Sequence, residues 1–510
     1  MLKDWFNANI KSYTIIILIF LFSRLLIFSS ILFIRSGPFS PNTCSFKWVS
    51  RHASITLPHK FSRILLGASS QGGRDVEVLL NGSHLCTLSL HEELDFYLID
   101  IKDEITAESS ELQFLASASW RLWDFRVDQD MTKSILTVQN LLFCQGISTK
   151  GLSRTVIQTE KTNALDNLRI GLSKWDANIY TRIIKEGYEY DGNNSVMHNV
   201  VFPHIYPIVS RTLYNSALHD PIWAGAAVNN LSFLLSLFFL FAISKIISND
   251  NQAGYISVTL MCFNPFGIFL ASAFSEGLFL LFMLAGIKYL YERKYTTFSF
   301  LAGALSGIRV VGMVAPAVLI LDYYLIQRNK PGIKNMLKMG ILSILSLWGI
   351  ASFMVYTRLR FGEWTVVFMN QNAWTPGNPK PRYFFMHLFE PVLNPAGYME
   401  PSVLGMGMAL LITAACVIYL FRNRKMVHRM GYILTIFSLL LLLVPMIFYS
   451  KAESIHDAFG RFTLTSLPGA ILLYKSHSSA RLVFTLLWLA FSVFSMVLMT
   501  MRYAWGLTPY

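Results

Sequence analysis

The run Tyr13-Thr-Ile-Ile-Ile-Leu-Ile-Phe-Leu-Phe-Ser-Arg-Leu-Leu-Ile-Phe-Ser-Ser-Ile-Leu-Phe33 is almost entirely apolar. A helix needs about 20 such residues to cross the hydrocarbon core of a bilayer. The run is too long for the core of a signal peptide, and no convincing small-residue cleavage site follows it. The sequence therefore predicts a retained first membrane span at about 13–35.

Most of the remaining chain is also apolar. Its 510 residues are 53% hydrophobic and 14% charged, whereas about 25% of the residues in an average soluble domain are charged. The net charge of +13 falls in short clusters between apolar runs, which is typical of cytoplasmic loops rather than of a nucleic-acid-binding face. These features predict a polytopic α-helical membrane protein that contacts membrane lipids and binds no nucleic acid.

The apolar runs predict about eleven transmembrane helices. They lie at about 13–35, 222–244, 254–273, 276–291, 297–310, 312–327, 337–357, 403–421, 431–449, 462–474 and 482–500. The expected organisation is a cytoplasmic N-terminus and first helix (1–35), an exoplasmic β-rich insert (36–150), an exoplasmic loop with interfacial helices (151–221), and a transmembrane bundle (222–510) with exoplasmic loops at 358–402 and 449–461.

Charge and parity predict the orientation of this bundle. Four linkers rich in Lys and Arg should share the cytoplasmic side: Lys288–Lys294, Arg328–Lys338, Arg422–Arg429 and Lys475–Arg481. An even number of spans must separate each consecutive pair, so the long run 297–327 must contain two short helices. Arg309 then lies near their outer turn, and the remaining polar linkers lie outside.

The insert changes to short runs of β-branched and aromatic residues separated by turn signals. Runs at 76–80, 85–90, 96–101 and 112–115 are typical of strands. Asn81-Gly82 between the first two predicts a hairpin turn. The pattern favours a small β-sandwich.

Acidic and aromatic residues gather in the loop that follows the insert. Ser173-Lys-Trp-Asp-Ala-Asn-Ile-Tyr180 is followed by Glu186-Gly-Tyr188 and Val201-Phe-Pro-His-Ile-Tyr-Pro207. The stretch is too polar and too rich in proline to cross lipid, and Trp and Tyr rings favour the membrane surface. A carboxylate here would lie between a lipid-borne donor and an aqueous acceptor.

Three blocks of sequence resemble the PIG-V (GPI mannosyltransferase II) family of GT-C glycosyltransferases and its bacterial relatives. The first is Trp175-Asp176 with the Glu186 and Phe-Pro elements that follow. The second is Phe263-Asn-Pro-Phe-Gly-Ile-Phe-Leu-Ala-Ser-Ala-Phe-Ser-Glu276, followed by Gly307-Ile-Arg309-Val-Val-Gly312. The third comprises Arg360-Phe-Gly-Glu363, Gln371, Trp374 and Gly460-Arg461-Phe462. The resemblance covers about 165–475 and omits the insert. Phe274 and Gly277 depart from the family pattern.

The resemblance implies a GT-C-like fold and transfer of a hexose, with mannose expected, from a polyprenyl-phosphate sugar to an acceptor hydroxyl with inversion. The acceptor would be a glycolipid, a glycan or a protein. Such enzymes place an essential acidic residue in the first exoplasmic loop, which Asp176 occupies. Asp176 is therefore the candidate general base.

The other candidate site residues are assigned to substrate binding. They are Trp175, Glu186, Tyr188, His204, Glu276, Arg309, Trp374 and Arg461. An arginine within lipid is costly unless it faces a polar cavity, and arginines suit a departing phosphate. The lipid-linked donor is a co-substrate. No residue is assigned to a metal, although a divalent ion remains an option; the spacing of His198 and His204 suits no zinc signature.

Simpler structural explanations exist for several of these residues. Asp176 could cap an interfacial helix, Glu186 could be a solvated loop acid, and Arg461 could extend to the membrane surface. Two other functions also stay open: a transporter or flippase of lipid-linked sugars, and an inactive relative that acts as a binding module. The expected location is the bacterial plasma membrane or the endoplasmic reticulum, with the active site exoplasmic.

Overall fold

The computed structural model describes residues 10–36, 47–49, 52–58, 63–69, 74–90, 95–100, 109–116, 120–127, 163–326, 332–374, 401–422, 429–449, 459–470 and 479–505. The chain divides into two compact units. The helical unit comprises Met1–Ile31, Leu168–Ala504 and Thr508–Tyr510, and the second unit comprises Leu32–Asn167 and Trp505–Leu507.

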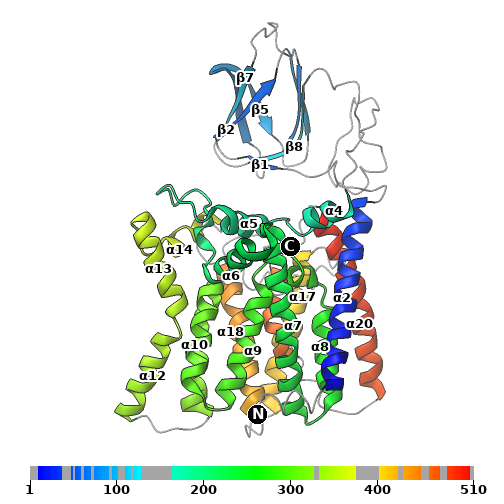
Figure 1. The fold of residues 1–510 in the computed structure, drawn as a ribbon, viewed down its shortest axis with the longest axis vertical. Coiled ribbons are helices and arrows are strands. Elements are labelled where there is room, and N and C mark those ends of the chain that lie inside the picture. Colours follow the sequence, from blue (N-terminus) through cyan, green and yellow to red (C-terminus); the bar gives the residue numbers. More distant parts are fainter. Residues whose placement is uncertain are drawn as a thin grey trace. The chain divides into compact units, whose positions relative to one another are not determined.

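The helical unit is a bundle of apolar helices with several short helices at one end (Figure 1). The elements from the N-terminus to the middle of the chain are α2 (Ile10–Ser36), α4 (Ala164–Gly171), α5 (Asp176–Glu186), η3 (Asn199–Val201), α6 (Ile205–Leu213), η4 (Tyr214–Leu218), α7 (Pro221–Ser248), α8 (Asn251–Cys262), η5 (Gly267–Leu270), α9 (Glu276–Tyr291), α10 (Tyr295–Ile308), η6 (Val310–Val314) and α11 (Ala315–Leu321). They continue with η7 (Asp322–Ile326), α12 (Ile333–Leu345), α13 (Trp348–Phe361), α14 (Val366–Met369), α15 (Gln371–Trp374), α17 (Pro401–Arg422), α18 (Arg429–Tyr449), α19 (Phe459–Ala470) and α20 (Ser479–Trp505).

Helix α9 is the central element of this bundle. It packs against α7, α10, α18 and α19, and most of its side chains are buried. Side chains that are apolar on every face suit a helix surrounded by other helices in a membrane bundle.

Four helices in the described parts are long and apolar enough to cross a membrane: Ile10–Arg35, Pro221–Ser248, Val403–Phe421 and Thr485–Ala504. The pair Ile333–Leu345 and Trp348–Phe361, bent by 52°, adds a fifth if it forms one span. Val310–Tyr324 and Arg429–Pro445 are shorter apolar helices. The chain is thus an integral membrane protein by composition and helix length, while the count of about eleven spans stays a prediction.

Two predicted features of the bundle can be compared directly with its helices. The run 297–327 is divided, because α10 ends at Ile308 and Arg309 has an extended backbone before η6 begins; this division was predicted. The single helix expected at 254–273 is wrong. Helix α8 ends at Cys262, since Pro265 cannot donate a helical hydrogen bond and the Asn264 side chain accepts the Phe266 N–H instead.

The two ends of α9 contact different groups of residues. At its last turn, Arg429 donates to the carbonyl oxygens of Leu290 and Tyr291 and pairs with Asp322 at 2.6 Å. Leu290, Asp322 and Arg429 lie in or beside three of the four basic linkers that were predicted to share the cytoplasmic side, namely 288–294, 328–338 and 422–429. At its first turn, Glu276 contacts Arg309 and Arg461. This arrangement agrees with the parity argument.

The second unit contains two four-stranded antiparallel sheets, ordered β1-β8-β3-β6 and β2-β7-β4-β5. The strands are β1 (Lys47–Val49), β2 (His52–Pro58), β3 (Arg63–Ser69), β4 (Arg74–Leu80), β5 (Ser83–Leu90), β6 (Asp95–Asp100), β7 (Ser109–Ala116) and β8 (Trp120–Val127). One hydrophobic cluster draws on both sheets, including Leu66, Ile99, Val78 and Phe114. Asn81 and Gly82 join β4 to β5 with positive φ angles of 49° and 82°, as predicted for this hairpin.

Parts of the predicted exoplasmic loops at 358–402 and 449–461 lie outside the described residues, namely 375–400 and 450–458.

The predicted orientation can be tested by cysteine labelling in a background that lacks the five native cysteines. Ser195→Cys, in the exposed loop after α5, should react with a membrane-impermeant maleimide applied from the exoplasmic side. Thr296→Cys, exposed in the first turn of α10, should react only after permeabilisation. Labelling of both positions from outside would contradict the topology.

Candidate functional site

Asp176 is the first residue of α5, and its position is set by an unusual backbone. Trp175 before it has φ 56°, which is uncommon for a bulky side chain and is found most often at functional sites. The helix ends at Glu186, and the next residue, Gly187, has φ 95°. A carboxylate in the first turn is stabilised by the positive end of the helix dipole.

Asp176, Glu276, Arg309 and Arg461 form one connected network of ion pairs. Arg461 donates from Nε to Glu276 Oε1 at 2.9 Å and from Nη1 to Asp176 Oδ2. Arg309 Nη1 donates to the same Glu276 oxygen. Two carboxylates therefore face two guanidinium groups, and α5, α9, the α10–η6 break and α19 are linked at one point.

Exposure separates the two acids in this network. The Asp176 side chain is 21% exposed, whereas Glu276 is 0% exposed and Arg461 is 6% exposed. The second oxygen of Glu276, Oε2, is buried without a hydrogen-bond partner. Asp176 is therefore the more accessible carboxylate of the two, and Glu276 holds the arginines from within the bundle.

Aromatic rings surround the two arginines. The Arg461 guanidinium lies 4.6 Å from the centre of the Phe274 ring and 5.4 Å from that of Phe269. The Arg309 guanidinium lies 5.3 Å from the Phe462 ring. A cation over an aromatic face is stabilised whether the ring is Phe or Tyr, so Phe274 preserves this contact.

Tyr180 was not singled out from the sequence, although it contacts several parts of the site. Its hydroxyl lies 3.0 Å from that of Ser275, next to Glu276. Its ring packs edge-on against Phe202 and Tyr206. Burial raises the pKa of Tyr180 to about 12, so the hydroxyl stays protonated. Tyr180 lies four residues after Asp176, and this spacing places the two side chains on one face of a helix. The spacing could have identified Tyr180 from the sequence.

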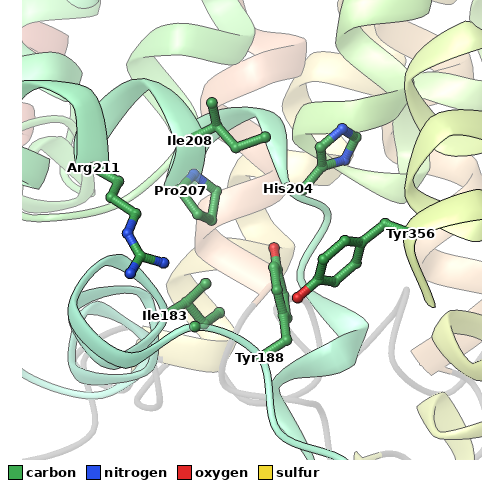
Figure 2. A pocket seen from close by; sticks show the side chains of 8 residues that line it. Ile183, Tyr188, His204, Pro207, Ile208, Arg211 and Tyr356 are labelled. Carbon is green, nitrogen blue, oxygen red and sulfur yellow. The ribbon is translucent and has the colours of Figure 1, made fainter. Parts of the chain in front are cut away.

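Tyr188 and His204 lie apart from this network, beside a cavity of about 140 Å³ (Figure 2). The cavity is lined by Ile183, Gly187, Tyr188, His204, Pro207, Ile208, Arg211 and Tyr356. Helix α5 separates it from Asp176, because 11 residues at 1.5 Å each give about 16 Å between Asp176 and Gly187. Tyr188 packs against Tyr356 and donates its hydroxyl proton to the Phe202 carbonyl oxygen at 2.8 Å.

His204 is held by two contacts beside the cavity. Its ring stacks on Phe353 at 5.3 Å, and Nε2 lies 3.2 Å from the Ser352 hydroxyl. Nδ1 is buried without a hydrogen-bond partner. Burial lowers the pKa of His204 to about 4, so the imidazole is neutral at neutral pH.

The two remaining candidates occupy separate positions. The Trp374 indole N–H donates to the His198 carbonyl oxygen at 3.1 Å, and its ring packs on Phe202. Glu186 is 48% exposed and lies 3.8 Å from Arg182 in an i,i+4 pair, which fits a solvated surface acid. No cluster of three or more His, Cys, Asp or Glu that could hold a metal lies within the described ranges.

The comparisons with known proteins confirm the predicted resemblance. Residues 138–367 match the family described as mannosyltransferase (PIG-V). Human GPI alpha-1,6-mannosyltransferase 2 is 26% identical over 167 residues, which are 31% of this chain and 32% of the human protein. GPI mannosyltransferase 2 of Drosophila pseudoobscura pseudoobscura is 26% identical over 118 residues, covering 21% of this chain and 25% of that protein. The chain thus spans about a third of these relatives or less.

The apo crystal structure of ArnT from Cupriavidus metallidurans is also similar. The TM-score is 0.40 at 13% identity, over 62% of this chain and 56% of ArnT.

The ion-pair network predicts strong coupling between Arg309 and Glu276. Arg309→Gln leaves the buried Glu276 carboxylate with Arg461 as its one cation, so its cost should fall below about 3–5 kcal/mol, which is the cost for a buried charge that loses every partner. Combining Arg309→Gln with Glu276→Gln should recover about 1–3 kcal/mol relative to the sum of the single effects. Unfolding in detergent measures all four proteins. Additive losses would contradict the coupling.

His204 predicts a specific loss of stability in acid. Its pKa is about 4 in the folded protein and about 6.5 when unfolded, so between these values the unfolded state binds the additional proton. This contribution to stability is present above pH 6.5 and is lost as the pH falls towards 4. His204→Asn should therefore lose fewer degrees of melting temperature than the wild type between pH 7 and pH 5.

His219→Asn, at an exposed histidine, is the control and should follow the wild type. The same acid sensitivity in His204→Asn and the wild type would exclude this role of His204.

Proposed function

We propose that this chain is a membrane glycosyltransferase that moves a hexose, with mannose expected, from a polyprenyl-phosphate sugar to an acceptor hydroxyl with inversion. Three observations support the proposal: the match to the PIG-V mannosyltransferase family, the apolar helices, and the accessible Asp176 carboxylate within the charge network. The accessible Asp176 carboxylate is the observation on which the proposal mainly rests, because it supplies a group that can take part in the reaction.

Asp176 acts as the general base in this proposal. Its carboxylate takes the proton of the acceptor hydroxyl as the acceptor oxygen bonds to the anomeric carbon, and the bond from that carbon to the phosphate oxygen breaks. The polyprenyl phosphate leaves with the bonding electrons. Arg461 holds the Asp176 carboxylate in one orientation, which matters because proton transfer requires about 2.6–3.2 Å between heavy atoms.

The negative charge that develops on the departing phosphate requires cationic groups in a partly desolvated site. Arg461 and Arg309 are the proposed groups, since Arg461 contacts both Asp176 and Glu276 and Arg309 contacts Glu276. Glu276 and Asp176 together balance the charge of the two arginines before substrate binds, so the site is close to neutral.

The names of the relatives support a glycolipid acceptor over a free glycan or a protein, because the human and Drosophila proteins are GPI mannosyltransferases. The proposal retains the predicted location, the bacterial plasma membrane or the endoplasmic reticulum. The proposal retains the predicted layout of about eleven spans, an exoplasmic sandwich-like insert and an exoplasmic active site.

Transfer assays with matched acidic variants test this function. Membranes containing the wild type, Asp176→Asn or Asp191→Asn are incubated with radiolabelled polyprenyl-phosphate mannose, and the label is followed into glycolipid. Loss of a general base should lower the rate by about 10²–10⁴-fold in Asp176→Asn. Asp191, exposed in the loop after α5, is the control, and Asp191→Asn should transfer at the wild-type rate.

Equal transfer by Asp176→Asn and the wild type would eliminate Asp176 as the base. Movement of labelled donor between leaflets without any glycosylated product would favour the flippase, and absence of both activities would favour an inactive binding protein.

A further inference from the structure

The segment between α8 and α9 is irregular, yet it lies inside the bundle. Every residue from 261 to 280 is buried, although α8 ends at Cys262 and α9 begins only at Glu276. Helical backbone satisfies its own polar groups, whereas irregular backbone in a water-poor interior requires partners from elsewhere. The segment ends at Glu276, the acid shared by both arginines of the charge network.

Asn229, in the first half of α7, supplies partners for this segment. Its Nδ2 donates to the carbonyl oxygens of Phe269 at 2.7 Å and Ser272 at 2.8 Å. Its Oδ1 accepts the Gly277 backbone N–H at 2.7 Å. The side chain is 0% exposed. It makes three of its four possible hydrogen bonds, two to the segment and one to the first turn of α9.

The bond to Gly277 acts at the first turn of α9. The first four N–H groups of a helix have no partner within the helix, and no side-chain cap is formed by Ser275. Asn229 therefore caps α9 from a neighbouring helix, one residue after Glu276.

Gly277 permits this contact. A Cβ atom at position 277 would lie 2.2 Å from the Asn229 carbonyl oxygen and 2.6 Å from Oδ1. Backbone atoms cannot move aside as the end of a side chain can, so the close approach of α7 and α9 requires glycine here. The departure of Gly277 from the family pattern is accounted for by this packing.

The adjacent Asn230 extends the same arrangement to α2. Its Nδ2 donates to the Ala271 carbonyl oxygen at 2.7 Å, and its Oδ1 accepts from Arg24 Nη1 at 3.4 Å. Arg24 is 4% exposed and lies over the rings of Phe20 and Phe233. A buried arginine in an apolar helix is costly, and here it contributes to holding the segment before Glu276.

We propose that Asn229 is a positioning residue that fixes the Glu276 carboxylate and, through Arg461, the Asp176 carboxylate. The inference rests on the proposed transferase function. Asn229 fixes the start of α9, so Glu276 stays within reach of both guanidinium groups, and Arg461 stays within reach of Asp176. Displacement of a catalytic group by about 1 Å can cost about 10²-fold in rate.

The kinetic test uses Asn229→Ala, with Ser236→Ala as the control. Ser236 is also buried on α7, but its hydroxyl donates to Phe233 within the same helix. Asn229→Ala should lower kcat by about 10-fold to 10²-fold per folded molecule while KM for the lipid donor changes by less than about twofold. Ser236→Ala should retain the wild-type values. A residue that only stabilises the fold would change the folded fraction and leave kcat per folded molecule unaltered.

A labelling test measures the position of the segment without any activity. Ser275→Cys, next to Glu276, is treated with N-ethylmaleimide, and the native Cys262 at the end of α8 is the internal reference. Adding Asn229→Ala should raise the labelling rate at position 275 by about fivefold or more through local opening. The rate at Cys262 should stay constant, and adding Ser236→Ala should change neither.

Unchanged kcat in Asn229→Ala, or unchanged labelling at position 275, would overturn the positioning role. Should the wild type transfer no mannose, the proposed function fails, and the labelling result alone decides whether Asn229 positions the segment.

Discussion

The rest of the site depends on the buried carboxylate of Glu276. One of its oxygens accepts from both Arg309 and Arg461, and Arg461 in turn holds Asp176. A carboxylate with no exposed surface is stable only beside opposite charge and hydrogen-bond donors. The acids and arginines come from α5, α9, the α10–η6 break and α19. The charge network therefore forms only when these elements pack correctly against one another.

The backbone around Glu276 and Arg309 departs from regular helix, so it loses hydrogen bonds that a helix would make within itself. The chain leaves the helical conformation after Cys262 and again at Arg309. The first irregular segment leads to Glu276, and the second break lies at its partner Arg309. Irregular backbone inside an apolar bundle must find hydrogen bonds from other helices, which Asn229 and Asn230 provide. The irregular segment before Glu276 and the break at Arg309 thus carry two members of the charge network.

The cavity beside Tyr188 and His204 and the charge network lie towards opposite ends of α5. The match to the PIG-V family covers Asp176, Glu276, Arg309, Tyr188 and His204, but it ends at residue 367. Arg461 lies beyond that limit and joins the site through its contacts. The strands of the second unit, which end at Val127, precede the matched region.

Local patterns were sufficient for several features. Hydropathy identified the long helices and Asn81-Gly82 determined a hairpin turn, because each depends on residues that are close in sequence. The basic linkers on either side of 297–327 required the break near Arg309, because spans between them must be even in number. Local patterns failed at 254–273, where burial of an irregular segment depends on Asn229 of another helix. Only the tertiary structure decided that Arg461 binds Asp176, 285 residues away, since long-range ion pairs are fixed by the packing of helices and leave no periodic signal in the sequence.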